Sequence, residues 1–165
     1  NLDRTRKQAQ DAMNELEMLK NQLAESEKEK EELKQKYEKN SNNLLATQLW
    51  LKAYHSGQTE DYKEAITFML SAIELKPDFD KNVYAKMYAN LATLNFDLAS
   101  YNKAKEYYET SIKIAPSAEA YGELSRLLKH LGEVEASENY LKSYGDLIGA
   151  ELPELPMPSE SKVTH

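Results

Sequence analysis

The first forty residues carry apolar side chains at a spacing of seven. With Leu2 as heptad position a, the a positions are Leu2, Ala9, Leu16, Leu23, Lys30 and Tyr37, and the d positions are Thr5, Ala12, Leu19, Ser26, Leu33 and Asn40. Eight of these twelve positions are apolar, and the segment contains neither Gly nor Pro. A narrow apolar stripe on an otherwise charged helix needs a partner to cover it. The pattern therefore predicts a coiled-coil helix over residues 1–40.

The charges beside this stripe indicate how two copies would pair. In a parallel dimer Glu15 meets Lys20 and Glu29 meets Lys34, and no repulsive pair arises in this register. Lys30 at an a position is also tolerated best in a dimer, because its stem can extend to water. We therefore favour a parallel homodimer. A single solvated helix, a helix packed back on its own domain and a helix bound to another protein are the alternatives. The expected oligomerisation seam comprises Leu2, Ala9, Ala12, Leu16, Leu19, Leu23, Leu33 and Tyr37.

After residue 41 the pattern changes to pairs of amphipathic helices, which continue to residue 149. The clearest unit contains Tyr88, Leu91 and Ala92, followed by Tyr101, Ala104, Tyr108 and Pro116. This order of aromatic, Leu, small, Ala, aromatic and closing Pro resembles the signature of the tetratricopeptide repeat (TPR). Similar residues recur before it (Tyr62, Ala65, Met69, Pro77) and after it (Tyr121, Leu124, Ser125, Leu141). The resemblance implies an all-α TPR solenoid of about three helix-turn-helix repeats, with units over about 42–77, 80–116 and 118–147.

Four details of this arrangement are expectations. The run of Asn and Ser over residues 40–43 favours a break between the long helix and the first repeat, because these residues cap helices well. Leu44 lies in phase with the a positions, however, so an unbroken helix also fits. The connection over residues 55–61 reads as longer than usual, and extra residues over 78–84 suggest a longer start to the next helix. The prolines at 153, 156 and 158 predict a flexible tail over residues 150–165.

Composition and charge exclude several kinds of function. The chain has no Cys, which excludes disulfides and thiolate metal sites. Its formal net charge of −7 argues against nucleic acid as a partner. We find no apolar run that could enter a membrane. The chain begins with Asn rather than Met, so we expect a fragment of a longer protein. Cytoplasm and periplasm are both compatible with it.

No motif indicates catalysis. The three His residues are far apart, and there is no HExxH, phosphate loop, GxSxG or Cys nucleophile. We therefore expect no enzyme activity, cofactor or metal.

The TPR resemblance instead implies a concave face that binds a peptide or a partner protein. By position, this face would include Lys86, Asn90, Thr93, Asp97, Glu119, Glu123, Arg126 and His130. Family members that bind chaperone tails place cations there, whereas this chain has Glu119 and Glu123. An acidic chaperone C-terminus is therefore not expected, and a mixed or basic peptide fits better.

These observations favour a protein-binding adaptor or scaffold that is oligomerised by the N-terminal helix. A structural self-assembly protein, whose repeats or tail bind a neighbouring copy, is one alternative. A regulatory segment of a larger protein is another.

Overall fold

The computed structural model describes residues 2–149, and every regular element in that range is an α-helix. The helices are α1 (Leu2–Gln58), α2 (Tyr62–Glu74), α3 (Lys81–Asp97), α4 (Tyr101–Ile114), α5 (Ala118–His130) and α6 (Val134–Ile148). The chain divides after Asn42 into two compact units. The predicted all-α fold with a long N-terminal helix is confirmed. The predicted tail lies outside the described residues.

The first unit is a single exposed stretch of α1. All residues from 4 to 42 are solvent-exposed, and Leu16, Leu23 and Tyr37 expose 69%, 61% and 73% of their surfaces. An apolar stripe left this exposed gives the isolated helix no tertiary stabilisation. Pairing through the seam stays a prediction.

The expected helix break at residues 40–43 is wrong, because α1 continues to Gln58. Good capping residues can lie inside a helix when their side chains find other partners. The Asn43 side-chain oxygen accepts a hydrogen bond from the backbone N–H of Asp78 at 2.6 Å. Asn43 therefore fastens the loop after α2 to α1, and does not start a new helix.

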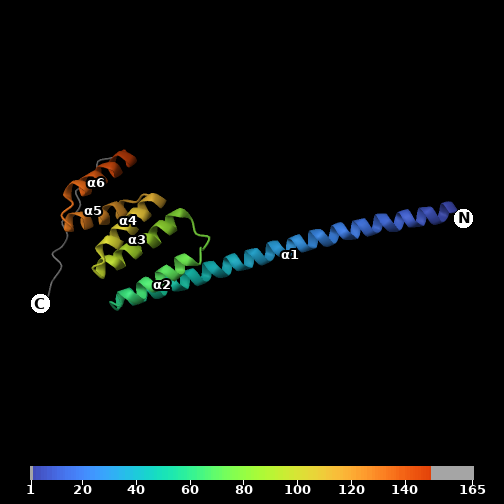
Figure 1. Ribbon diagram of the computed structural model, residues 1–165, viewed down its shortest axis with the longest axis horizontal. Helices are drawn as coiled ribbons and strands as arrows, with labels where there is room; N and C mark the ends of the chain where they lie inside the picture. Colours follow the sequence, from blue (N-terminus) through green and yellow to red (C-terminus); the bar gives the residue numbers. More distant parts are fainter. Residues whose placement is uncertain (1, 150–165) are drawn as a thin grey trace. The chain divides into compact units, whose positions relative to one another are not determined.

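The second unit contains three antiparallel helix pairs, formed by the end of α1 with α2, by α3 with α4, and by α5 with α6 (Figure 1). Small residues allow the helices of each pair to approach closely. Ala53, Ala92 and Ser125 are buried on the first helices, and Ala65, Ala104 and Ser137 are buried on the second helices. In the last pair, the Ser137 hydroxyl donates to the Ser125 carbonyl at 3.0 Å. The cores of successive pairs therefore form a stack.

The turn inside each pair repeats one backbone geometry. Glu60, Ala99 and Gly132 have φ values of 62°, 60° and 81°. The residue after each one donates its backbone N–H to a carbonyl five residues earlier, as Ser100 does to Asn95 at 2.8 Å. The first turn follows directly on Gln58, so the long connection expected over residues 55–61 is wrong.

The extra residues expected over 78–84 divide between the loop after α2 and the start of α3. Helix α3 has 17 residues and α5 has 13, so the longer helix start is confirmed. The loop after α2 is also longer than the one after α4, and Asp80 ends it by accepting a hydrogen bond from the Val83 N–H at 3.0 Å. The side chain of Tyr84 donates back to the Pro77 carbonyl at 2.5 Å. These bonds fix the start of α3, which carries much of the candidate site.

Candidate peptide-binding cleft

A cleft of about 610 Å³ opens in the second unit, against the first helix of each pair. Helix α3 contributes Lys86, Asn90, Thr93, Leu94 and Asp97, and α5 contributes Glu119. Helix α1 contributes Thr47, Trp50, Leu51, Ala53, Tyr54, Gly57 and Gln58, and α2 contributes Tyr62 and Met69. Five of the eight residues predicted for the concave face therefore line one cavity: Lys86, Asn90, Thr93, Asp97 and Glu119.

Asp97 and Glu119 place two carboxylates on the wall of this cleft, with Lys86 as the cation. Partial desolvation raises the pKa of the Asp97 carboxyl above its ordinary value. The pKa of Tyr62 is raised by desolvation and then by the negative charges of Asp97 and Glu60. Asp97 of α3 thus acts on a group of α2, and a cation placed beside Asp97 would favour its charged form.

A hydrogen bond beneath the cleft holds α3 against α4. The Thr93 hydroxyl lies 2.8 Å from the Tyr108 hydroxyl and donates its own hydrogen to the Ala89 carbonyl at 3.1 Å. Because a hydroxyl has one hydrogen, Tyr108 is the donor to Thr93. Desolvation is the main cause that raises the pKa of Tyr108 to about 12. The phenol is therefore a neutral structural support at physiological pH.

The other three predicted residues do not line the cleft. Arg126 forms an ion pair with Glu123 at 2.6 Å, three residues earlier on α5. The His130 ring lies against Tyr101 and Phe96, with centroid separations of 5.0 Å and 6.0 Å. A heptad or repeat position gives the helix face of a residue but cannot show that a neighbour already engages its side chain.

Sequence reasoning missed the aromatic side of the cleft, which Trp50, Tyr54 and Tyr62 provide. Before Tyr88, the repeat pattern was matched only in the second helix of the pair, from Tyr62 to Pro77, so the first helix had no assigned positions. The 39-residue offset from Tyr62 to Tyr101 carries Ala53 onto Ala92, and both are buried. Applying that offset backwards from α3 would have placed Trp50, Leu51 and Tyr54 on the first helix of the pair.

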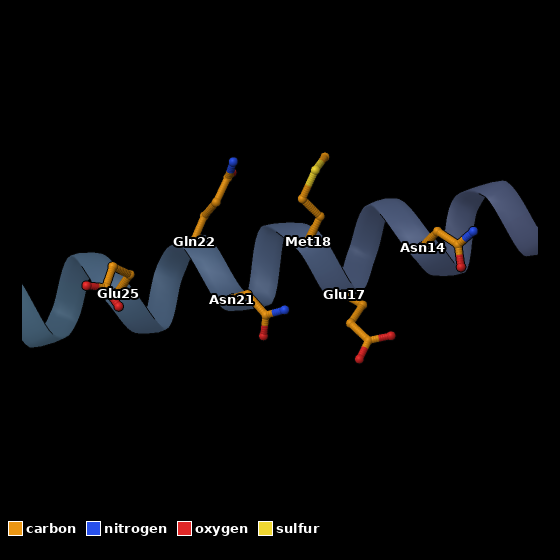
Figure 2. Close-up of a pocket in the computed structure, with 6 residues that line it drawn as sticks. All are labelled: Asn14, Glu17, Met18, Asn21, Gln22 and Glu25. Carbon is orange, nitrogen blue, oxygen red and sulfur yellow. The ribbon is translucent and has the colours of Figure 1, made fainter.

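A second surface, on the first unit, does not form an enclosed site. Asn14, Glu17, Met18, Asn21, Gln22 and Glu25 surround a shallow hollow on α1. Figure 2 shows Met18 and Gln22 projecting from one side of the helix, and Glu17 and Asn21 from the other. One helix cannot surround a small ligand, so this surface suits only a partner that lies along it.

Neither a metal cluster nor a membrane-spanning helix occurs among residues 2–149. No group of three or more His, Cys, Asp or Glu side chains there could hold a metal ion. No helix in the same range is long and apolar enough to cross a membrane.

Comparison with known proteins agrees with this architecture. The tetratricopeptide-repeat family model matches residues 49–79 and 85–117, which cover the first two helix pairs. No curated protein matches the chain significantly.

Several solved structures share the fold. The TPR domain of Arabidopsis OM64 has 17% identity and a TM-score of 0.55, and the match covers 64% of this chain and 84% of that one. The Sgt2 TPR domain from Aspergillus fumigatus has 14% identity and a TM-score of 0.55, over 67% and 70% of the two chains. A TPR-like protein from Chlorobium tepidum has 17% identity and a TM-score of 0.52, over 72% and 88%.

Repeated helix pairs, recurring small residues at their contacts and a matching family model lead to one assignment. Residues 49–79 and 85–117 match the tetratricopeptide repeat, and the second unit has the tetratricopeptide-repeat fold, which generally mediates protein–protein interaction.

Proposed function

We propose that this chain is a protein-binding adaptor that holds a cationic peptide segment in the cleft of its second unit. The observation that carries the proposal is the combination on the cleft wall of Asp97 and Glu119 with the aromatic rings of Trp50, Tyr54 and Tyr62. Carboxylates attract Lys and Arg side chains, and aromatic faces bind them through cation–π contact.

The apolar part of the cleft suits the rest of such a segment. Leu51, Met69 and Leu94 lie among the polar residues that line it. Asn90 offers both a donor and an acceptor to a peptide backbone. Lys86 lies on the same wall, so one acidic position in the peptide is also compatible. A peptide of Lys or Arg with apolar neighbours therefore satisfies more of the cleft than an acidic one.

Selection of twelve-residue peptides from a random display library tests this proposal. We expect the recovered peptides to be enriched in Lys and Arg, and the tightest of them to bind about tenfold more weakly to Asp97→Lys and to Glu119→Lys, a loss of about 1.4 kcal/mol each. Glu138→Lys makes the same charge change at an exposed position on α6 and is the matched control. Acidic recovered peptides, or equal weakening by Glu138→Lys, would contradict the proposal.

We also propose that the first unit joins two copies in parallel. The support is the exposed stripe that includes Leu16, Leu19 and Leu23, together with the pairing of Glu15 with Lys20 and of Glu29 with Lys34 in that register. Two linked clefts would bind a partner with two such segments more tightly than one cleft, without any new contact.

Light-scattering mass measurement tests the pairing. We expect a dimeric mass for the chain, a monomeric mass when residues 1–40 are removed, and a monomeric mass for Leu16→Glu combined with Leu23→Glu. Asn21→Glu changes an exposed position on the outer side of the same helix and should leave the dimer intact. A monomeric mass for the unaltered chain would refute the dimer.

A further inference from the structure

The last turns of α1, within the second unit, present two opposite faces. Ala46, Ala53 and Ser56 are buried against the repeat core, with exposed fractions of 0%, 1% and 8%. Leu44, Leu51 and Tyr54 expose 61%, 61% and 64% of their surfaces. The core therefore uses one side of this stretch and leaves an apolar stripe on another.

The exposed stripe keeps the seven-residue phase of the N-terminal seam. Counting on from Leu23 without interruption puts Leu44 and Leu51 at a positions and Thr47 and Tyr54 at d positions. The buried Ala46 and Ala53 fall at c and Ser56 at f, which are outer positions of a coiled coil. One stretch of helix thus has a face for its own repeats and a separate face with coiled-coil spacing.

The flanking positions identify which partner fits this face. In a parallel pair of copies, Asn43 would face Gln48 and Trp50 would face His55, so no like charges oppose each other. The a/d positions themselves are uncharged over residues 44–54. An identical helix in the same register meets both requirements, apolar spacing and neutral flanks.

We propose that residues 44–54 of α1 form an interface with the same residues of a second copy. This proposal rests on the parallel pairing proposed for the first unit, which would deliver the second copy in the correct register. Thr47, Leu51 and Tyr54 belong both to this interface and to the wall of the cleft. The second copy therefore lies at the cleft and covers part of the surface that a peptide needs, so that self-pairing regulates access to the site.

Disulfide trapping tests the interface, because the chain has no Cys of its own. Leu44→Cys and Tyr54→Cys place single thiols on the proposed interface, and Leu19→Cys places one on the seam of the first unit. Lys52→Cys is the matched control, since Lys52 is exposed on the same turns of α1 but occupies a b position. Disulfides require Cβ atoms that approach closely, so only facing positions link readily. We expect Leu44→Cys and Tyr54→Cys to form covalent dimers about tenfold faster than Lys52→Cys, whose rate accounts for the raised effective concentration in any dimer.

The outcomes separate this inference from the pairing on which it rests. If Leu19→Cys links rapidly but Leu44→Cys and Tyr54→Cys link no faster than Lys52→Cys, the interface at residues 44–54 is refuted and pairing of the first unit stands. If no variant exceeds the control, both are refuted. Rapid linking at residues 44 and 54 without linking at residue 19 supports the interface and refutes the seam.

Trp50 supplies an independent readout because it is the sole Trp, lines the cleft and occupies a g position beside the proposed interface. We expect its emission to shift to longer wavelength on dilution of the unaltered chain, since separation of the copies exposes the ring to water. Leu44→Glu combined with Leu51→Glu should abolish that dependence on concentration. Emission that does not change on dilution through the measured dimer–monomer transition would overturn the inference.

Discussion

Because of Tyr108, the repeat core should lose stability at alkaline pH. Its pKa is raised to about 12, mainly by desolvation, whereas an unfolded tyrosine ionises near its ordinary pKa of 10.0. Between these values the unfolded state has lost the proton and the folded state has kept it. The free energy of unfolding therefore falls as pH rises through this window, by about 2–3 kcal/mol for this one group.

Tyr108→Phe isolates this contribution. At pH 7 we expect the variant to be about 1 kcal/mol less stable, because the hydrogen bond to Thr93 is lost. Above pH 10 the difference should shrink and reverse, because Phe cannot ionise. Urea unfolding of both proteins at several pH values measures the difference, and the ionisation of other groups cancels between them. A difference that stays constant with pH would show that Tyr108 does not resist ionisation.

The Asp97 carboxylate lowers the stability of the folded state, although it would help to bind a cationic peptide. Desolvation raises its folded pKa, so the folded state is penalised at pH values above that pKa and relieved as pH falls through it. We expect Asp97→Asn to raise the thermal unfolding midpoint at pH 7 and to have no such effect at a pH below the ordinary carboxyl range. Glu138→Gln, at an exposed position on α6, should change neither value. A midpoint for Asp97→Asn that is lower at pH 7 would count against the penalty.

At the scale of elements, the three turns inside the helix pairs form a natural comparison. All three require a left-handed residue, but only Gly132 has no side chain to strain there. Left-handed backbone costs a residue with a Cβ about 1–2 kcal/mol relative to glycine. Nothing lies within 4 Å of a Cβ built on Gly132, so substitution there tests the backbone alone.

We expect Ala99→Gly to stabilise the second unit by about 1 kcal/mol and Gly132→Ala to destabilise it by a similar amount. Ala118, at the start of α5, is an exposed control position where Ala→Gly should not stabilise. Chemical unfolding followed by circular dichroism measures all three variants. If Ala99→Gly proved destabilising, the turn would owe its stability to contacts of the Ala99 side chain.

Sequence spacing predicted these elements well where one physical cause dominated. Tyr88, Leu91 and Ala92 indicated a repeat because packed helix pairs demand that order of sizes. The break near Asn43 was predicted wrongly because capping propensity is local, whereas the Asn43 side chain bonds to Asp78, far along the chain. Five of the predicted concave residues line the cleft, but Arg126 and Glu123 pair with each other. The spacing of three residues between Glu123 and Arg126 on α5 is a signal that could have indicated this pairing.

At the scale of the whole molecule, the proposals for cleft and interface predict that peptide binding and self-pairing oppose each other. Both need Leu51 and Tyr54, and one surface cannot be covered twice. Coupling between sites is reciprocal, so a peptide that excludes the second copy must itself be excluded by it to the same degree. This competition therefore requires both the cleft and the proposed interface at residues 44–54.

Leu44→Glu provides the means to measure this coupling, because Leu44 lies on the proposed interface but does not line the cleft. With the tightest peptide recovered from display, we expect the variant to bind about fivefold more tightly than the unaltered chain, since a competitor has been removed. Asn42→Glu, at an exposed outer position, should leave the affinity unchanged. Saturating peptide should in turn slow disulfide formation in Leu44→Cys while leaving that of Leu19→Cys unaltered. Equal affinities for Leu44→Glu and the unaltered chain would mean that two copies can pair without covering the cleft.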